Sequence, residues 1–332
     1  MSLNHDRSYN RQIRAWLKRN FEYAARLSQG ALEGRMCPVC KSSEFFHFAN
    51  NGCFNYVRCA ACALVYMNPA LNSAEVRSGF RGDDQLLMDY FRIIKQFKSA
   101  PPADAPDPLR DGQLKDIYRY KSHGSLLDVG CSVGDFLHKA KHFYHVEGVE
   151  VNPVTSAVAE QHFKVHKDYL GNLISSDPVA FNKRYDIVSM NQVLYGVPDP
   201  AGLLKDIHAA LKDDGIVYIN TPNADSFAVQ LYKGRANHLY GYTTQNVFNR
   251  KSLERLAAEC GFGVSQFRTE WLDIYYRDVM ALLEDATEFI HKRNSHLPNY
   301  EEHIAMEDEL QTRLDLDLGE NGNYIVAILT KC

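Results

Sequence analysis

The sequence lacks the long hydrophobic runs that membrane-spanning helices require. No stretch of about eighteen consecutive apolar residues occurs, and the N-terminus holds no apolar signal-peptide core. The chain also lacks an excess of charge, since its formal net charge is −4. A net charge of this size does not indicate nucleic acid or an anionic membrane as a partner. We therefore expect a cytoplasmic protein with no membrane partner.

Internal repeats are also missing, so repeat architectures are not indicated. The 332 residues correspond to about two domains by the usual size of domains. Because 45% of the residues are hydrophobic, the chain can bury a sizeable core. The sequence therefore predicts a globular protein of more than one domain. It does not indicate the oligomeric state.

Eight cysteines need an explanation other than disulfide bonds in a cytoplasmic protein. Four of them form two C-x-x-C pairs, Cys37 with Cys40 and Cys59 with Cys62, separated by eighteen residues. This spacing is typical of a zinc ribbon, in which two short hairpins each donate two thiolates to one tetrahedral ion. A redox C-x-x-C pair is the alternative, but it leaves the second pair unexplained. Four thiolates leave no open metal position, so the zinc is expected to be structural.

The segment 126–136, with sequence LLDVGCSVGDF, has the pattern of a strand, a tight turn and the start of a helix. Gly130 and Gly134 bracket the turn, where the backbone must bend or approach a ligand closely. Asp128 and Asp135 flank it, and carboxylates there would repel the pyrophosphate of a dinucleotide. S-adenosylmethionine has no phosphate and carries cationic groups that tolerate nearby carboxylates. The motif therefore favours this cofactor.

With these acids and glycines, the motif resembles that of the class I S-adenosylmethionine-dependent methyltransferases, with Ser132 in place of the middle glycine. Glu150 ends the second predicted strand, where an acid can accept both ribose hydroxyls. The resemblance implies that Val151 covers one adenine face and that Asp168 reaches the adenine amino group beside Tyr169. It also implies that Gly130 and Asn191 hold the methionine end. The full set expected to bind the cofactor is Asp128, Gly130, Ser132, Gly134, Glu150, Val151, Asp168, Tyr169 and Asn191.

From about residue 112 strand and helix patterns alternate, which predicts an α/β fold with a doubly wound, mostly parallel seven-stranded sheet. This Rossmann-like methyltransferase domain is expected over residues 112–332, with a helical insertion at about 272–320. The resemblance implies that the last strand lies antiparallel beside the fifth. Smaller parts precede the domain: a basic amphipathic helical segment at 1–36, the zinc ribbon at 37–68, and a helical connector with a proline-rich linker at 69–111. One helix is expected from Ser73 to Phe97.

The zinc ribbon and this domain together resemble bacterial methyltransferases of secondary metabolism and of surface sugars, including C-methyltransferases of keto-sugars. Two Glu-His pairs of that subgroup are absent, because the chain has Tyr195-Gly196-Val197 and Thr243-Thr244 at those places. Removing a carbon-bound proton requires a placed base, so keto-sugar methylation is not carried over. His238, Tyr240 and Tyr195 are the candidate catalytic bases.

We expect a methyltransferase that uses S-adenosylmethionine, carries a structural zinc and methylates a small-molecule acceptor at oxygen. An RNA methyltransferase is the main alternative, because zinc ribbons and basic helices can bind phosphates. The acidic net charge argues against a nucleic-acid partner. A non-catalytic scaffold that retains the cofactor-binding fold is a second alternative, since the Glu-His pairs are missing.

Overall fold

A computed structural model describes residues 12, 32–50, 54–83, 85–98, 107–236, 238–239, 241, 243–270 and 322–332. Four predictions consequently fall wholly or largely outside the described residues: the helical segment at 1–36, the proline-rich linker, the insertion at 272–320, and the placement of Tyr240.

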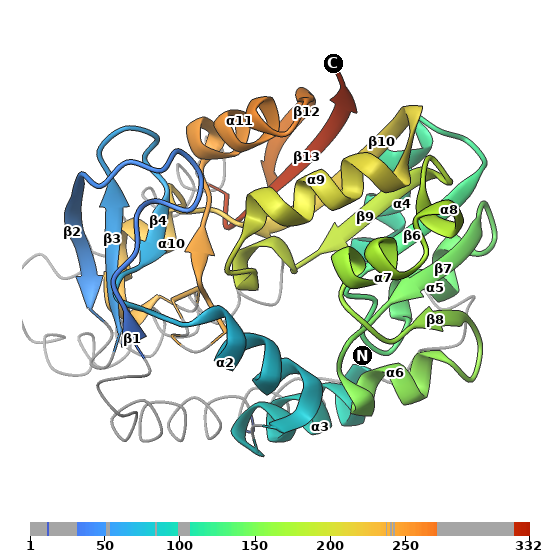
Figure 1. Ribbon diagram of the computed structural model, residues 1–332, viewed down its shortest axis with the longest axis horizontal. Coiled ribbons are helices and arrows are strands. Elements are labelled where there is room, and N and C mark those ends of the chain that lie inside the picture. The colour runs from blue at the N-terminus through green and yellow to red at the C-terminus, as the bar shows by residue number, and fades with distance from the viewer. Residues whose placement is uncertain are drawn as a thin grey trace, which may run out of the picture.

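The described residues contain a seven-stranded sheet with the order β12-β13-β10-β9-β6-β7-β8 (Figure 1). Six of its strands run in the same direction, and β13 lies antiparallel between β10 and β12. This confirms the predicted Rossmann-like fold class and the antiparallel last strand beside the fifth. The strands are β6 (Ser125–Val129), β7 (His145–Val149), β8 (Lys164–His166), β9 (Tyr185–Asn191), β10 (Leu211–Pro222), β12 (Phe262–Glu270) and β13 (Tyr324–Lys331).

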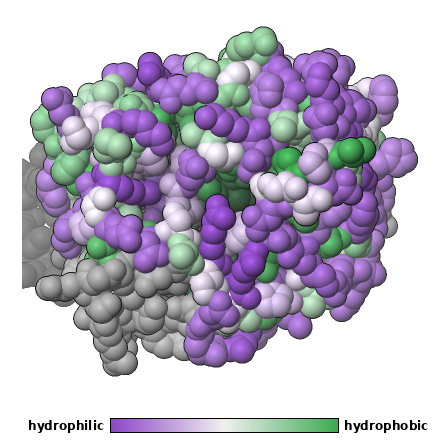
Figure 2. All heavy atoms as spheres, viewed as in Figure 1, coloured by the Kyte–Doolittle hydropathy of each residue, from purple (hydrophilic) through white to green (hydrophobic). Residues whose placement is uncertain are grey.

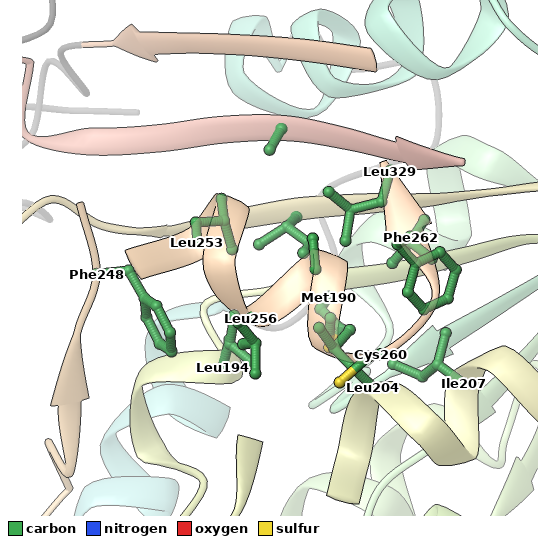
Figure 3. Close-up of a cluster of buried hydrophobic side chains, with 14 of the residues drawn as sticks. Met190, Leu194, Leu204, Ile207, Phe248, Leu253, Leu256, Cys260, Phe262 and Leu329 are labelled. Carbon is green, nitrogen blue, oxygen red and sulfur yellow. The ribbon is translucent and has the colours of Figure 1, made fainter. Parts of the chain in front are cut away.

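Both faces of the sheet are buried because neighbouring residues on a strand point to opposite sides. Leu126 of β6 packs with α4 and α5 on one face, and Leu127 packs with α7, α8, α9 and α11 on the other. Figure 3 shows the second layer, where side chains of α9 and α11 meet those of β9, β12 and β13. The helices are α4 (Pro108–Tyr118), α5 (Asp135–Ala140), α6 (Pro153–Ala159), α7 (Leu170–Ser176), α8 (Pro178–Phe181), α9 (Pro200–Ala210), α10 (Phe227–Tyr232) and α11 (Arg250–Glu259), with the 3-10 turns η3 (Leu194–Gly196) and η4 (Lys233–Arg235).

Side-chain caps begin several of these helices. Asp199 accepts a hydrogen bond from the backbone N–H of Gly202 at the start of α9, and Asn249 forms a capping box at the start of α11. Asp107 caps α4 in the same way, and the sequence patterns did not reveal this helix. Over the described residues, no helix combines the length and the apolar character needed to cross a bilayer.

The region before the sheet differs from prediction at two places. Residues 32–33 form a strand, β1 (Leu32–Glu33), which pairs antiparallel with β5 (Ala70–Leu71) instead of continuing a helix. The single helix expected from Ser73 to Phe97 is divided into α2 (Ser73–Ser78), a π-helical turn η2 (Gly79–Asp83) and α3 (Gln85–Lys98). Gly82 causes the break, because its φ of +112° lies in a region that helices do not use.

The cysteine-rich region forms a second sheet that includes a strand from the methyltransferase-like domain. In the described part of the chain its order is β11-β4-β3-β2, with β2 (Phe45–Asn50), β3 (Asn55–Cys59), β4 (Val65–Met67) and β11 (Asn246–Val247). Because β11 comes from the connection between α10 and α11, hydrogen bonds between strands join the two regions. In Figure 1 this smaller sheet lies at the left of the large one.

Two polar side chains, the half-buried Arg35 and the buried Tyr56, strengthen this junction. Arg35 donates hydrogen bonds to the carbonyl oxygens of Met67 at 3.0 Å and Gln245 at 2.7 Å. Tyr56 of β3 accepts a hydrogen bond from the N–H of Gly241 at 2.9 Å and donates one to the carbonyl of Thr244 at 3.1 Å. Because Tyr56 is fully buried, these backbone groups have no access to water as a substitute.

We expect Tyr56→Phe to lower the free energy of unfolding by about 1–3 kcal/mol, because it leaves the buried N–H of Gly241 without its partner. Chemical denaturation measures the change. Tyr120→Phe is the matched control, since the Tyr120 hydroxyl is exposed and its contact with the Ser265 carbonyl is 3.5 Å long. Equal midpoints for the two variants would contradict the role given to Tyr56.

Candidate functional site

A cavity of about 470 Å³ opens at the carboxyl ends of β6, β7 and β9. In the sheet order β6 lies between β9 and β7, so the chain winds in opposite directions from this point. Such switch points are the usual ligand sites of open parallel sheets, and the volume is typical of a small-molecule site. Helices α2 and α3 and the start of α9 form the remaining walls. Figure 2 shows a hollow near the middle of this face, with hydrophobic side chains at its floor and hydrophilic ones around it.

The glycine loop between β6 and α5 forms one wall. Gly130 has a φ of +75°, and a Cβ atom on it would lie 2.4 Å from Cγ2 of Val193. Ser132 also adopts a positive φ, +53°, at the position where the resembled family has its middle glycine. Gly134 lies off the cavity, and a Cβ atom there would meet the ring of Phe163 at 3.1 Å, so its structural contribution is close packing of α5.

Glu150 lies on the cavity wall directly after β7 and is buried. Its Oε2 atom accepts a hydrogen bond from the N–H of Ser132 at 2.9 Å, and its Oε1 atom accepts one from the N–H of Asn152 at 2.7 Å. Burial raises the pKa of this carboxyl group to about 7, against the opposing effect of the backbone N–H groups. One carboxylate thus joins the glycine loop to the end of β7, and its remaining lone pairs can accept hydroxyl donors.

Asp128 lies beneath the cavity and does not line it. Its Oδ1 atom accepts hydrogen bonds from Oγ of Ser189 at 2.7 Å and from Nδ2 of Asn191 at 3.5 Å. Burial raises the pKa of Asp128 to about 7. Asn191 does line the cavity, and its Oδ1 atom has no hydrogen-bond partner among the described residues. Asp128 therefore orients a cavity residue and has no direct contact with the cavity.

Asp168 and Tyr169 occupy different places although they are adjacent. Tyr169 lines the cavity beside Val151. Asp168 does not line it and instead pairs with Arg81, accepting a hydrogen bond from Asn172 as well. Burial alone would raise the pKa of Asp168, but the hydrogen bonds from Asn172 and from the N–H of Tyr169, together with Arg81, hold it below its usual value.

The two candidate bases among the described residues, Tyr195 and His238, lie in different places relative to the cavity. Tyr195 lies in η3 and lines the cavity. His238 is buried outside the lining, with its ring centre 4.9 Å from that of Tyr324 on β13, and burial lowers its pKa to about 4. The structure thus does not bring His238 to the cavity, and the catalytic role predicted for it has no geometric support.

Sequence reasoning missed two acids on the cavity wall. Asp199 lies at the N-terminal end of α9, and Asp206 lies seven residues further along this helix. Both line the cavity. Burial, and then the charge of Asp199, raise the pKa of Asp206, while Arg77 has the opposite effect. The signal that could have identified the two acids was their seven-residue spacing, which begins at Asp199 in the Val-Pro-Asp-Pro turn. Gln192 also lines the cavity and was missed. Its backbone has a positive φ of +59°, which no sequence pattern indicates.

The four predicted zinc ligands come together. The sulfur atoms of Cys37, Cys40, Cys59 and Cys62 all lie within 4.8 Å of one another, and two of the pairs are 3.4 and 3.5 Å apart. Sulfur atoms around a tetrahedral zinc ion with bonds of about 2.3 Å are about 3.8 Å apart, so this arrangement fits the ion. A hydrogen bond from Cys62 lowers the pKa of the Cys37 thiol, and the same contact raises the pKa of Cys62, so the thiolate of Cys37 is stabilised by the proton on Cys62.

The fold and the site together define a class. A doubly wound sheet with the order seen here, a glycine loop after its first strand and an acid at the end of the next are the features that Rossmann-like folds use to bind nucleosides. Residues 106–266 match the profile of a family described as a methyltransferase domain. This match agrees with the methyltransferase domain that the sequence predicted.

Individual relatives are more distant. The chain is similar to a ubiquinone biosynthesis O-methyltransferase of Actinobacillus pleuropneumoniae, with 26% identity over 137 residues that cover 38% of this chain and 57% of that protein. It is also similar to a tRNA U34 carboxymethyltransferase of Nautilia profundicola, with 29% identity over 108 residues that cover 29% of this chain and 33% of that protein. The chain thus spans a little over half the length of the first of these relatives. A solved SAM-dependent methyltransferase from Archaeoglobus fulgidus superposes with a TM-score of 0.48 at 17% identity, covering 73% of this chain and 99% of that one.

The raised pKa of Glu150 predicts a proton release when ligand binds. In the free protein burial favours the protonated form, so this group's contribution to stability is present below a pH of about 4.5 and is lost as the pH rises through about 7. Hydroxyl donors from a nucleoside favour the carboxylate instead. Calorimetric titration with S-adenosylhomocysteine at pH 7, in phosphate and in Tris buffer, should therefore show release of up to about half a proton.

Glu150→Gln should reduce both the proton release and the affinity. An amide does not titrate, and its NH₂ group cannot accept one of the two hydrogen bonds that Ser132 and Asn152 donate to separate carboxylate oxygens. Glu254→Gln, on the exposed side of α11, is the matched control and should retain both. Identical binding heats in the two buffers would count against the role of Glu150.

Proposed function

We propose that the protein transfers a methyl group from S-adenosylmethionine to a hydroxyl oxygen of a small molecule. The observation that carries this proposal is the cavity at the switch point, where the buried Glu150 and the Gly130 loop share one wall. The match of residues 106–266 to a methyltransferase domain supports the reaction class. The name of the Actinobacillus relative, an O-methyltransferase of ubiquinone biosynthesis, supports oxygen as the methylated atom.

The cavity walls provide contacts for each part of the cofactor. Glu150 would accept the ribose hydroxyls, and Val151 with Tyr169 would cover the adenine. The backbone at Gly130 and Ser132, and the unpartnered Oδ1 atom of Asn191, would hold the methionine end. Asp128 acts through Asn191, and Asp168 acts by fixing the start of α7 beside Tyr169.

The acceptor would occupy the part of the cavity between α3 and α9. Aromatic rings of Phe80, Tyr90 and Phe91 line it on the α3 side. Their contacts are edge-to-face, with centroid distances of 6.0 Å for Phe80 with Phe91 and 5.5 Å for Tyr90 with Phe91. Such walls favour a flat apolar acceptor with few polar groups.

The bound cofactor supplies a methyl group on a positively charged sulfur. The walls would place the acceptor oxygen against that carbon and exclude water, which is what an in-line transfer with C–O bond formation and C–S bond cleavage requires. The hydroxyl proton must leave, and a placed base assists its removal. Asp206 and Tyr195 are the described side chains on this wall that could receive it. Asp206 is favoured because burial and the charge of Asp199 raise the pKa of this carboxyl group above its usual value, which makes its carboxylate a stronger base.

The methyl-transfer test uses labelled S-adenosylmethionine and a fractionated small-molecule extract. We expect the label to appear in a methyl ether, and Asp206→Asn to lower kcat by about 10²–10⁴-fold at pH 7 while S-adenosylhomocysteine affinity is unchanged. In the unaltered protein kcat should fall as the pH drops and Asp206 becomes protonated. Binding of S-adenosylhomocysteine without transfer to any fraction would support the scaffold alternative.

RNA remains the second candidate acceptor because of the similarity to a tRNA carboxymethyltransferase. The same labelled cofactor is offered with total RNA at several salt concentrations. Labelled RNA, with binding that weakens steeply as salt rises, would replace the small-molecule proposal. We expect no label in this fraction.

We also propose that the cysteine cluster holds one structural zinc ion. Metal analysis should find about one zinc per chain, and Cys37→Ser should lose it because a tetrahedral site then lacks a ligand. Cys332→Ser is the matched control, since Cys332 is exposed and remote from the cluster in sequence. A folded protein without zinc would contradict the proposal.

A further inference from the structure

A chain of polar side chains runs from the cavity to the far side of the sheet. Nε2 of Gln192, at the end of β9, donates to Oδ1 of Asn220 on β10. Nδ2 of Asn220 donates to Oε1 of Glu270 on β12 at 2.9 Å. Arg268 donates to Oε2 of Glu270 at 2.8 Å and to Asp116 of α4 at 2.5 Å.

The Glu270 carboxylate determines which side-chain atom donates and which accepts in each of these hydrogen bonds. A carboxylate paired with an arginine can only accept, so Asn220 must turn its NH₂ group toward Glu270. The carbonyl oxygen of Asn220 then faces Gln192, which must donate through its own NH₂ group. The carbonyl oxygen of Gln192 is therefore the polar atom left for another partner.

Gln192 lies on the cavity wall, and its backbone is held in an unusual conformation. Its φ of +59° is uncommon for a residue other than glycine, and its N–H donates to the carbonyl of Asn220 at 2.9 Å. Within the described residues, Oε1 of Gln192 has no hydrogen-bond partner. Strained backbone at a cavity wall often marks a residue whose side chain must point in one direction.

We propose that Glu270 and Asn220 orient Gln192 so that its carbonyl oxygen accepts a hydrogen bond from the methyl acceptor, which is a hydroxylated aromatic compound. This assignment of the acceptor rests on the proposed O-methylation. The aromatic wall of Phe80, Tyr90 and Phe91 favours the ring, and an oriented acceptor atom favours a ligand with a hydroxyl donor. Gln192 determines specificity, and Glu270 and Asn220 are positioning residues.

A double-mutant cycle tests the orientation without any ligand. Gln192→Glu places a carboxylate against the Asn220 oxygen and should lower the unfolding midpoint. Glu270→Gln should lower it too, because Arg268 loses its charged partner. In the double variant Asn220 can reverse, accepting from residue 270 and donating to residue 192. Its midpoint should lie about 2–4 °C above the value expected from adding the two single shifts.

Glu254→Gln combined with Gln192→Glu is the matched control, and its shifts should add. Additive shifts in the Glu270 cycle would overturn the proposed orientation.

A matched pair of ligands tests the contact with the acceptor. Catechol and its dimethyl ether, veratrole, share a ring but only catechol has hydroxyl donors. In the protein saturated with S-adenosylhomocysteine, we expect catechol to bind about fivefold more tightly by ligand-observed NMR titration. Gln192→Met, which has a similar length and no strong acceptor, should bring this ratio close to one.

An unchanged ratio in Gln192→Met, equal binding of the two compounds to the unaltered protein, or no binding of either would overturn the acceptor contact. Failure to bind S-adenosylhomocysteine would instead contradict the proposed function. The double-mutant cycle is independent of cofactor, so it still decides whether the orientation of Gln192 is set by Glu270.

Discussion

The geometry of the site depends on the buried carboxylate of Glu150, which connects the glycine loop to the start of α6. It accepts hydrogen bonds from the backbone of Ser132 in the glycine loop and of Asn152 at the start of α6. The loop backbone contains three residues with positive φ, Gly130, Ser132 and Gly134, and such a turn needs external hydrogen bonds to keep one conformation. Burying a carboxyl group disfavours its charge, and a ligand that donates hydroxyl groups would offset this cost.

The cysteine-rich region and the methyltransferase domain form a continuous structure. Strand β11 completes the smaller sheet, and the clustered cysteines share a hydrophobic cluster with the central sheet. The connection that Tyr56 holds through Gly241 and Thr244 also contains Thr243, which lines the cavity. A zinc ion held by these cysteines would therefore affect the shape of the cavity through β3 and β4.

The cavity combines apolar walls with a small number of oriented polar atoms. Asn191 is oriented by Asp128, and Gln192 by Asn220 and Glu270, so two adjacent residues at the end of β9 each depend on a carboxylate behind them. This repetition has a physical reason. An amide side chain can present either its oxygen or its nitrogen, and a carboxylate behind it removes the choice.

Local patterns in the sequence determined the fold class, the cysteine cluster and the acid at Glu150, because the burial of alternating strands, metal-ligand spacing and the strand-turn-helix motif all act over short distances. Tertiary structure alone decided which of those residues reach the cavity. Asp168 and Gly134 turn away from it, His238 is buried against Tyr324, and Asp206 and Gln192 face it. Their positions depend on contacts between segments far apart in the chain, and on backbone conformations such as the positive φ of Gln192, which residue spacing does not encode.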